Sequence, residues 1–402
     1  MIKIYFENDK TELSNAKNDS KFIAKTEIPD FVKFTTNITK ILSLVKKYKS
    51  YSNIIIIGNG GAINPFRSFY TSLSKTNKKV YFLNTVDPDY IIELKKLDTK
   101  DTLIVMISKS GTNLTAIESF FAFWKYKKII ITTMNDNPLY KIVEKNNLDF
   151  LAYPSIEDFP KLDDRHTGIS AAGLTPTALL GIDIKEIYAG AKTMQTKCGL
   201  KIGFHKNPAL HLATTLFELE KKGYNEIFCP VYSTKLIGFL PFIIQQMHET
   251  VCKDGKGQTI FGDLAPESQH HTNQRIFGGK RNVIILFITV KKRDNVLSVK
   301  VPTKVSNFNI KKGKLQDLEG ISYSSLLEYE FKGTFQHAIE ENIPVIHLEI
   351  EKITPKTVGE LLVFFQYVAW YSALLRGVNP IGQPAVERSK EIGSELTIKN
   401  KK

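Results

Sequence analysis

Cysteine is scarce in this chain of 402 residues, which contains only Cys198, Cys229 and Cys252. An odd count without a CxxC spacing argues against a disulfide framework and favours a reducing compartment. Long apolar runs are also lacking, since none approaches the ~18 residues of a membrane helix. The first ten residues, MIKIYFENDK, carry charges throughout and have no apolar core. We therefore expect a cytoplasmic protein without a signal peptide or a membrane partner.

Negative charge is in the minority, because 41 Asp and Glu residues stand against 55 Lys and Arg residues, giving a formal net charge of +14. A basic balance favours anionic partners such as phosphorylated metabolites, nucleic acids or acidic membranes. The lysines occur in every region, however, which is also typical of ordinary solvated surfaces. The first forty residues show no helix-turn-helix pattern, so we expect no specific nucleic-acid partner.

Short apolar runs alternate with amphipathic stretches along most of the chain. The runs are rich in β-branched residues and predict buried strands at 54–57, 80–83, 103–107, 129–132, 227–231, 283–290 and 344–350. The amphipathic stretches predict helices at 64–74, 112–127, 236–248 and 358–375. In the helix over 112–127, one apolar face is expected to carry Leu114, Ile117, Phe120, Phe121 and Trp124.

This alternation predicts an α/β protein with two doubly wound sandwich domains, each built around a central, mainly parallel sheet. At ~100–200 residues per domain, the chain is long enough for both. The expected divisions are an N-terminal lead (1–40), a first domain (41–200), a second domain (201–376) and a C-terminal helical tail (377–402).

Two loops of the first domain follow predicted strands directly, where parallel sheets bind ligands. The first, GNGGA (Gly58–Ala62), has Ile63 in place of the third glycine of a dinucleotide fingerprint. It is either a tight turn or a place where backbone N–H groups approach an anion. The second, SKSGT (108–112), offers three hydroxyls, a lysine and a turn glycine before a helix beginning near Thr112. One polar residue would cap that helix, so the larger set indicates a phosphate monoester site.

Two further stretches carry groups suited to acid–base chemistry. HETVC places Glu249 at the end of an apolar helix, where it is either a partly buried catalytic base or an ordinary solvated residue of the helix end. The same stretch lacks the second histidine of a zinc motif. QHHTNQR contains His270 and His271, which on a strand would point to opposite faces and would not bind one metal together. One of them is a candidate proton shuttle, or alternatively both are structural or surface histidines.

Arg165, in DDRHTGIS, is a candidate for holding an anionic intermediate, or alternatively a surface partner of Asp163 or Asp164. Near the C-terminus, NPIGQPAVERSK combines turn residues with the start of a helix and contains Lys390. Lys390 alone does not indicate a function.

Six stretches, taken together and in order from about residue 54 to residue 390, resemble the phosphoglucose isomerase family. GNGGA resembles the family's GIGGS loop, SKSGT its SK[ST]xT phosphate loop, and DRHTGISAAGLTPTALLGID its segment GRYS…SAVGLLPAAL. HETVCKDGKG resembles ES.GK, QHHTNQ falls where the family has GQH, and NPIGQPAVERSK resembles NxFDQxGVExGK. The resemblance implies two sugar-isomerase (SIS) domains and a homodimer whose active site is shared, with the histidine coming from the partner subunit.

The resemblance also implies a reaction: reversible aldose–ketose isomerisation of glucose 6-phosphate and fructose 6-phosphate through a cis-enediol, in glycolysis and gluconeogenesis, without a metal or other cofactor. Glu249 would be the base that moves the proton between C2 and C1, and Arg165 would stabilise the enediolate. His270 and Lys390 would assist opening of the sugar ring. The substrate-binding residues implied in the same way are Gly61, Ala62, Ser108, Lys109, Ser110, Thr112 and Gln383.

The sequence departs from the family pattern at several positions. Ala62 replaces a serine, Val251 and Cys252 add bulk after Thr250, and APES replaces the GTNG before the family's histidine, so that His271 competes with His270. The NPIGQ stretch lacks the family's Phe-Asp pair. These departures leave two alternatives open: a dual-specificity isomerase that also accepts mannose 6-phosphate, and a non-catalytic regulator that binds sugar phosphates.

Overall fold

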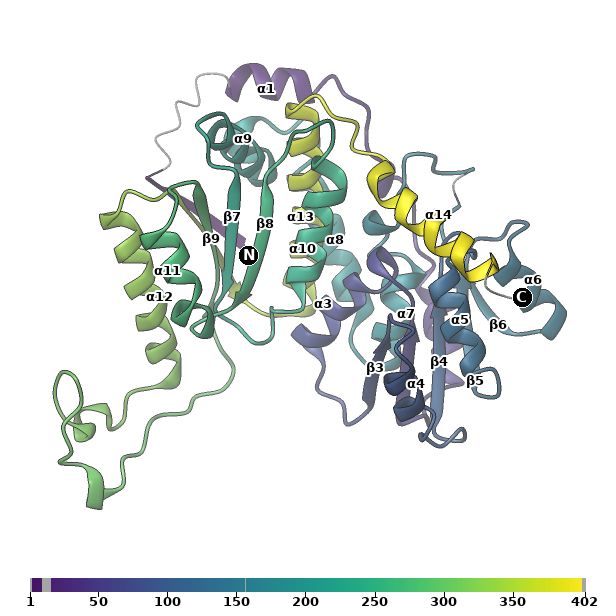
Figure 1. Cartoon of the computed structure of the whole chain (residues 1–402), viewed down its shortest axis with the longest axis horizontal. Helices are drawn as coiled ribbons and strands as arrows, with labels where there is room; N and C mark the ends of the chain where they lie inside the picture. The colour runs from purple at the N-terminus through teal and green to yellow at the C-terminus, as the bar shows by residue number, and fades with distance from the viewer. Residues whose placement is uncertain (1, 9–15, 156, 400–402) are drawn as a thin grey trace. The chain divides into compact units, whose positions relative to one another are not determined.

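The computed structural model describes residues 2–8, 16–155 and 157–399. The chain forms two compact units that interleave along the sequence (Figure 1). Unit 1 comprises Met1–Thr11, Leu219–Ile237 and Thr259–Ile353, and unit 2 comprises Glu12–Glu218, Gly238–Gln258 and Thr354–Lys402. The predicted domains are contiguous segments, whereas these units are not. The units and the predicted domains are therefore different divisions of the chain. The boundaries after residues 40, 200 and 376 stay a prediction.

Unit 2 is built on a parallel five-stranded sheet with the order β3-β2-β4-β5-β6. Its strands are β2 (Asn53–Ile57), β3 (Lys79–Leu83), β4 (Thr102–Ile107), β5 (Lys127–Thr132) and β6 (Asp149–Ala152). The three central strands β2, β4 and β5 are almost completely buried, because β-branched runs such as NIIII and TLIVMI have apolar side chains for both faces of a covered sheet.

Helices cover this sheet, and others extend the unit beyond it. One face of the sheet packs against α4 (Pro88–Leu94), α5 (Leu114–Ala122) and α6 (Pro138–Asn146). The remaining α-helices that lie in unit 2 are α1 (Ala16–Ile23), α2 (Ile38–Lys46), α3 (Asn64–Leu73), α7 (Ala171–Leu179), α8 (Ile184–Lys197), α10 (Phe239–Val251), α13 (Pro355–Leu375) and α14 (Pro384–Lys399). Short 3-10 turns are η2 (Asp30–Val32), η3 (Gly60–Ala62), η4 (Asp164–His166) and η5 (Phe204–Lys206).

Helix α13 is the apolar centre of unit 2. It passes the length and hydropathy criteria for a membrane span, but 89% of the apolar window is buried inside the protein, which accounts for its composition. Two glycines let it cross α8 closely. A Cβ on Gly190 would lie 1.9 Å from the Lys356 carbonyl oxygen, and one on Gly359 would lie 2.0 Å from the Ile187 carbonyl oxygen.

Unit 1 contains the second sheet, with the order β1-β10-β9-β7-β8. Strand β1 (Ile2–Glu7) pairs antiparallel with β10 (Val345–Lys352), and the other neighbours are parallel. The remaining strands are β7 (Glu226–Val231), β8 (Thr259–Leu264) and β9 (Val283–Lys292). Helices α11 (Thr272–Gly278) and α12 (Tyr323–Glu340) and the turn η6 (Glu267–His270) belong to this unit, and α9 (Pro208–Lys221) ends in it. The predicted α/β class with mainly parallel sheets is confirmed.

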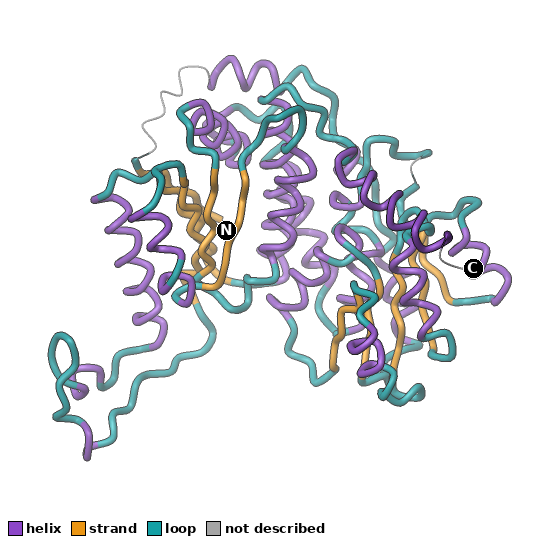
Figure 2. The backbone as a smooth tube through the Cα atoms, in the orientation of Figure 1, coloured by secondary structure: helices purple, strands orange, loops and turns teal. Residues whose placement is uncertain are grey.

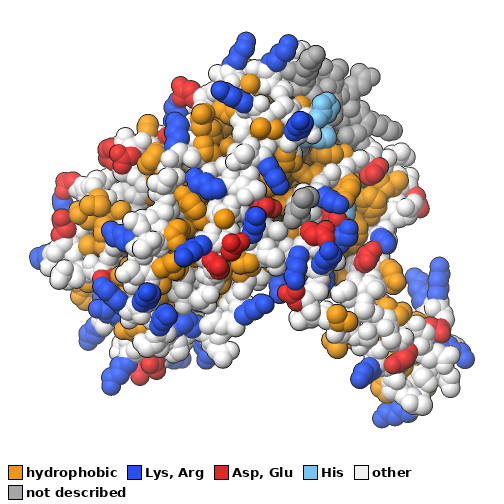
Figure 3. Space-filling model, turned by 180° about the vertical axis from the view of Figure 1, so that it is seen from behind, with side chains coloured by type: hydrophobic (Ala, Val, Ile, Leu, Met, Phe, Trp, Pro, Cys, Tyr) orange, Lys and Arg blue, Asp and Glu red, His pale blue; other side chains and the backbone are white. Residues whose placement is uncertain are grey.

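Between β9 and α12 the chain leaves the sheet of unit 1 and runs as loops with the turns η7 (Thr303–Val305) and η8 (Leu315–Leu318) (Figure 2). We call residues 293–322 the arm. Its apolar side chains stand in solvent, with Val296 88% and Leu297 66% exposed. On the face drawn in Figure 3, lysines and arginines are scattered among acidic and apolar side chains and form no single patch.

Every predicted strand is present, whereas the helix predicted over 112–127 is only partly right. Helix α5 begins at Leu114 after an Asn113 cap and ends at Ala122. Its buried side is formed around Phe120, with Phe123 buried just beyond the helix, while Phe121 and Trp124 are exposed. The expected apolar face was wrong because apolar residues occur on both sides of this short helix.

Candidate active site

Two loops of unit 2 meet at the carboxyl edge of its sheet. Strand β2 lies between β3 and β4, so the sheet order reverses direction there, and the loops after β2 and β4 are neighbours at the switch point. Ligands of open α/β sheets bind at such points. The loops in question are GNGGA and SKSGT, as the sequence predicts.

The loop after β4 is organised by its own hydroxyls. The buried Ser108 Oγ accepts a hydrogen bond from the Gly111 N–H at 3.2 Å, and Ser110 Oγ accepts one from Thr112 Oγ1 at 3.0 Å. Gly111 has φ +63°, and a Cβ there would lie 1.9 Å from Asn137 Oδ1, so glycine is required. Ser110 and Thr112 remain exposed at the start of α5, where hydroxyls and free N–H groups suit a phosphate.

Lys109 ties this loop to the segment that carries Arg165. Its Nζ donates a hydrogen bond to the Leu162 carbonyl, so the ammonium group does not simply point into solvent. Burial lowers the pKa of Lys109, and the carboxylates of Asp164 and Asp163 oppose that effect. Burial also raises the pKa of Asp164, with the charge of Lys109 acting in the opposite direction.

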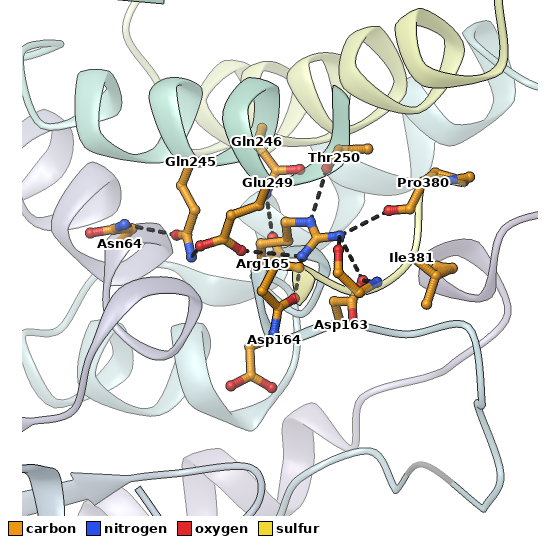
Figure 4. A network of polar contacts seen from close by, with 12 residues as sticks. Asn64, Asp163, Asp164, Arg165, Gln245, Gln246, Glu249, Thr250, Pro380 and Ile381 are labelled. Carbon is orange, nitrogen blue, oxygen red and sulfur yellow. Dashed lines mark hydrogen bonds and ion pairs between the residues drawn. The ribbon is translucent and has the colours of Figure 1, made fainter. Parts of the chain in front are cut away.

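Arg165 is the centre of the site (Figure 4). Its side chain is fully buried, and hydrogen bonds run from all three of its nitrogens to acceptors within unit 2. These acceptors are Thr250 Oγ1 (2.9 Å), Glu249 Oε2 (3.1 Å), Gln383 Oε1 (3.0 Å), Asp163 Oδ2 (2.7 Å) and the carbonyls of Pro380 (2.8 Å) and Gly382 (3.3 Å). The pairing of Arg165 with Asp163 that the sequence left open does occur, but in the interior and not on the surface.

Glu249 lies on α10 with both carboxylate oxygens engaged. Oε2 accepts from Arg165, and Oε1 accepts from Gln245 Nε2 at 3.0 Å. Gln245 is held in turn by Asn64, whose Nδ2 donates to Gln245 Oε1 at 2.8 Å. The Glu249 side chain is still 25% exposed, so a ligand can reach a carboxylate whose orientation is fixed from two sides. A carboxylate held in this way is a candidate for proton transfer to and from a bound ligand.

Gly61 shows how closely the loop after β2 approaches this centre. A Cβ at Gly61 would lie 2.4 Å from the backbone nitrogen of Arg165 and 2.7 Å from its Cα. Backbone therefore packs against backbone, which only glycine permits. The neighbouring Ala62 is buried and contributes no polar group.

Of the two predicted C-terminal site residues, Gln383 contacts the site directly and Lys390 is linked to it through Glu387. Gln383 contacts Arg165 directly, and its Nε2 donates to Glu387 Oε1 at 3.2 Å. Lys390 Nζ donates to the same Glu387 oxygen at 2.9 Å, so Lys390 joins the network at its exposed end on α14. Hydrogen bonds to Lys390 and Gln383 lower the pKa of Glu387.

His270 belongs to unit 1, outside the set that unit 2 brings together. It ends the turn η6, and His271 follows directly, so the strand considered for this pair was wrong. Both rings are exposed, and His271 Nδ1 lies 2.7 Å from Thr272 Oγ1.

Comparison with known proteins gives the same assignment as the motifs. Residues 30–402 match the family model of phosphoglucose isomerase. The chain belongs to the phosphoglucose isomerase family. It is 28% identical over 357 residues to the glucose-6-phosphate isomerase of Methanocaldococcus jannaschii, covering 86% of this chain and 85% of that protein.

Solved structures agree on the fold of this family member. A hypothetical protein from Thermus thermophilus superposes with a TM-score of 0.86 at 19% identity, covering 98% of this chain and 100% of that one. A glucose-6-phosphate isomerase from Chlamydia trachomatis superposes with a TM-score of 0.75 at 19% identity, covering 96% of this chain and 75% of that one.

Sequence reasoning missed three amide side chains of this candidate site: Asn64, Gln245 and Gln246. Gln246 is buried, and its Nε2 donates to the Arg165 carbonyl at 2.5 Å. For Gln245 a signal was present, because it lies four residues before Glu249 on the same helix face. Asn64 and Gln246 had none, since their partners are distant in sequence.

Proposed function

We propose that this protein is a glucose-6-phosphate isomerase that interconverts glucose 6-phosphate and fructose 6-phosphate through a cis-enediol. The observation that carries the proposal is the contact of Glu249 Oε2 with Arg165 Nη1 at 3.1 Å, in a chain of this family. A reachable carboxylate beside a buried guanidinium supplies the base and the positive charge that enediol chemistry requires.

In the proposed reaction, Glu249 removes the proton from C2 of the open-chain aldose and returns it to C1, while the hydroxyl proton passes from O2 to O1, which leaves the ketose. Negative charge develops on the enediol oxygens between these two steps. Every N–H of Arg165 is already directed at a protein acceptor. We therefore assign to Arg165 a fixed positive charge near the reacting carbons, which needs no reorganisation during the reaction.

The phosphate of the substrate is proposed to lie on the loop after β4. Ser108, Ser110 and Thr112 would supply hydroxyls, and Lys109 would supply charge from its half-buried position. Gly61 and Ala62 would line the sugar on the side of β2, and Gln383 would complete the lining beside Arg165. Binding energy from the phosphate then positions C1 and C2 against Glu249.

Ring opening is proposed to use His270 and Lys390, with the histidine supplied by the partner subunit of a homodimer. The exposed apolar residues of the arm in unit 1, Val296, Leu297 and Phe308, support self-association, because a partner subunit could cover them. We further propose that the enzyme works in the cytoplasm without a cofactor and without a specific nucleic-acid or membrane partner.

A second activity on mannose 6-phosphate is favoured by one observation, the apolar Ala62 at a position where the family has serine. The change at Thr250 favours it less, since the Thr250 hydroxyl is occupied by Arg165 Nε. Incubation with mannose 6-phosphate decides this point: fructose 6-phosphate among the products supports dual specificity, and its absence excludes it.

A coupled assay tests the main proposal. Purified protein receives fructose 6-phosphate, EDTA and glucose-6-phosphate dehydrogenase, and NADPH formation reports the product. Turnover is expected with EDTA present. Activity that appears only after zinc or manganese is added would contradict the metal-free mechanism. No activity under either condition would favour the non-catalytic sugar-phosphate regulator.

A further inference from the structure

Lys253 lies four residues after Glu249, just beyond the end of α10, and no role for it follows from the chemistry above. Its side chain is half-buried, and its ammonium group donates to the Asn379 carbonyl at 2.6 Å and to the Ile381 carbonyl at 3.0 Å. Both acceptors belong to the loop 379–383 that joins α13 to α14.

The same loop presents its other carbonyls to Arg165. Pro380 and Gly382 accept from Arg165 Nη2, at 2.8 Å and 3.3 Å. Successive carbonyls of the loop, at residues 379, 380, 381 and 382, thus alternate between Lys253 and Arg165. The Gly382 N–H donates to Asp163 Oδ2 at 3.0 Å, which adds an anchor on the side of Arg165.

We propose that Lys253 is a positioning residue that clamps the loop 379–383 against Arg165 and thereby sets the place of Gln383 and of the guanidinium. This inference rests on the proposed isomerase function. Lys253 touches none of the reacting groups in this account. It acts through the loop, because Gln383 follows Gly382 directly and contacts Arg165 Nη1 at 3.0 Å.

The clamp should depend on pH. Burial and the nearby charge of Arg165 lower the pKa of Lys253 to about 8, while Asp163, Glu249 and Asp254 oppose this. The charged groups that face Lys253 are thus the Arg165 guanidinium and these three carboxylates. A neutral amine donates weaker hydrogen bonds than an ammonium group. Turnover should therefore fall as the pH rises through about 8.

Lys256 offers a matched control three residues away. Its Nζ also donates to a backbone carbonyl, that of Arg376, at 2.8 Å, but this carbonyl lies outside the part of the loop that contacts Arg165. Lys253→Met and Lys256→Met remove the same charge and the same kind of contact, and Lys253→Arg keeps a cation that does not titrate near pH 8.

We expect Lys253→Met to lower kcat about 10-fold at pH 7 with KM within about 2-fold, since misplacement of a site costs mainly turnover. Lys256→Met should keep kcat within about 2-fold, because its acceptor does not touch Arg165. Lys253→Arg should restore most of the turnover and remove the decline above pH 8. Equal kcat in the two Met variants, or a decline that persists in the Arg variant, would overturn the proposal.

Hydrogen exchange of the Ile381 and Gly382 amides provides a readout that needs no turnover. These amides should exchange faster in Lys253→Met than in the wild type or in Lys256→Met. A wild-type protein without isomerase activity would refute the proposed function, and the exchange rates would still decide the clamp. Unchanged exchange in Lys253→Met would refute the clamp whatever the activity.

Discussion

At the scale of single residues, the site depends on a charge that is buried and fully hydrogen-bonded. Arg165 is 1% exposed and has two carboxylate partners, Asp163 and Glu249. A buried ion pair of this kind contributes little net stability compared with apolar packing, but loss of one partner is costly, at about 3–5 kcal/mol. The arrangement is therefore better explained by the chemistry of the site than by stability.

Glu249→Gln tests the base while keeping size and shape. We expect kcat to fall ~100-fold or more, because an amide cannot accept the C2 proton, with KM little changed. The coupled assay measures both constants, and a thermal unfolding curve close to that of the wild type serves as the control for folding. Turnover near the wild-type value would remove Glu249 from the mechanism.

Gly61→Ala tests the close approach of the loop after β2. The added Cβ would meet the Arg165 backbone at 2.4 Å, and backbone cannot move aside as a flexible side chain can. We expect a loss of about 2 kcal/mol or more in the free energy of unfolding. We also expect kcat to fall ~10-fold or more, because Arg165 is displaced.

Gly393→Ala, in helix α14 of the same unit, is the matched control, since its Cβ would meet nothing within 4 Å. It should leave kcat unchanged and stabilise the helix by up to about 1 kcal/mol. Denaturant unfolding and the coupled assay measure both effects. Similar losses in the two variants would contradict the explanation by close approach.

At the scale of elements, the sequence predicted best what depends on local pattern. The buried strands β2, β4 and β5 were found because short β-branched runs have few other uses. The crossing of α8 and α13 through Gly190 and Gly359 was not predicted, because the two helices are more than 150 residues apart in the sequence and only their contact gives the glycines a purpose.

In the candidate site, too, residues within motifs were predicted, whereas contacts between distant parts of the chain were not. Arg165, Glu249 and Gln383 were predicted through motif order, and the structure brings their side chains into contact. The clamp by Lys253 and the hydrogen bond from Asn64 to Gln245 join parts of the chain that share no motif, so only the fold reveals them.

Helix α5 allows capping and phosphate binding to be separated. Asn113 caps the helix by accepting from the Ala116 N–H at 3.1 Å, whereas the exposed Thr112 hydroxyl contacts only Ser110 among the described residues. Asn113→Ala should lower the free energy of unfolding by about 1 kcal/mol. Thr112→Ala should leave stability within about 0.5 kcal/mol and raise KM for fructose 6-phosphate. An unchanged KM in Thr112→Ala would remove its hydroxyl from the phosphate site.

At the scale of the whole molecule, the chain passes between the two units several times. Unit 2 receives α10 from residues 238–258 and α13 from residues after 353, so its core is complete only after most of the chain is present. Glu249, the proposed base, and the loop 379–383 belong to these two late segments, whereas Arg165 belongs to the first segment of unit 2. The candidate site and the core of unit 2 therefore draw on the same late segments of the chain.

The proposed homodimer makes a prediction that separates a shared site from an independent one. Glu249→Gln and His270→Ala are each expected to be inactive, and the two proteins are mixed under conditions that exchange subunits. Random exchange makes half of the dimers mixed. If each site takes Glu249 from one subunit and His270 from its partner, one of the two sites in a mixed dimer has both wild-type residues. Activity should then recover to roughly a quarter of the wild-type value.

Mixing Glu249→Gln with Arg165→Lys is the control, because these residues lie 3.1 Å apart within one unit of one chain and no exchange of subunits can restore a site. Sedimentation equilibrium establishes that the wild type and the mixtures are dimeric. Recovery in the first mixture alone supports the shared site. No recovery from dimers that demonstrably exchange would place Glu249 and His270 of one active site in the same subunit, and a monomeric wild type would refute the homodimer itself.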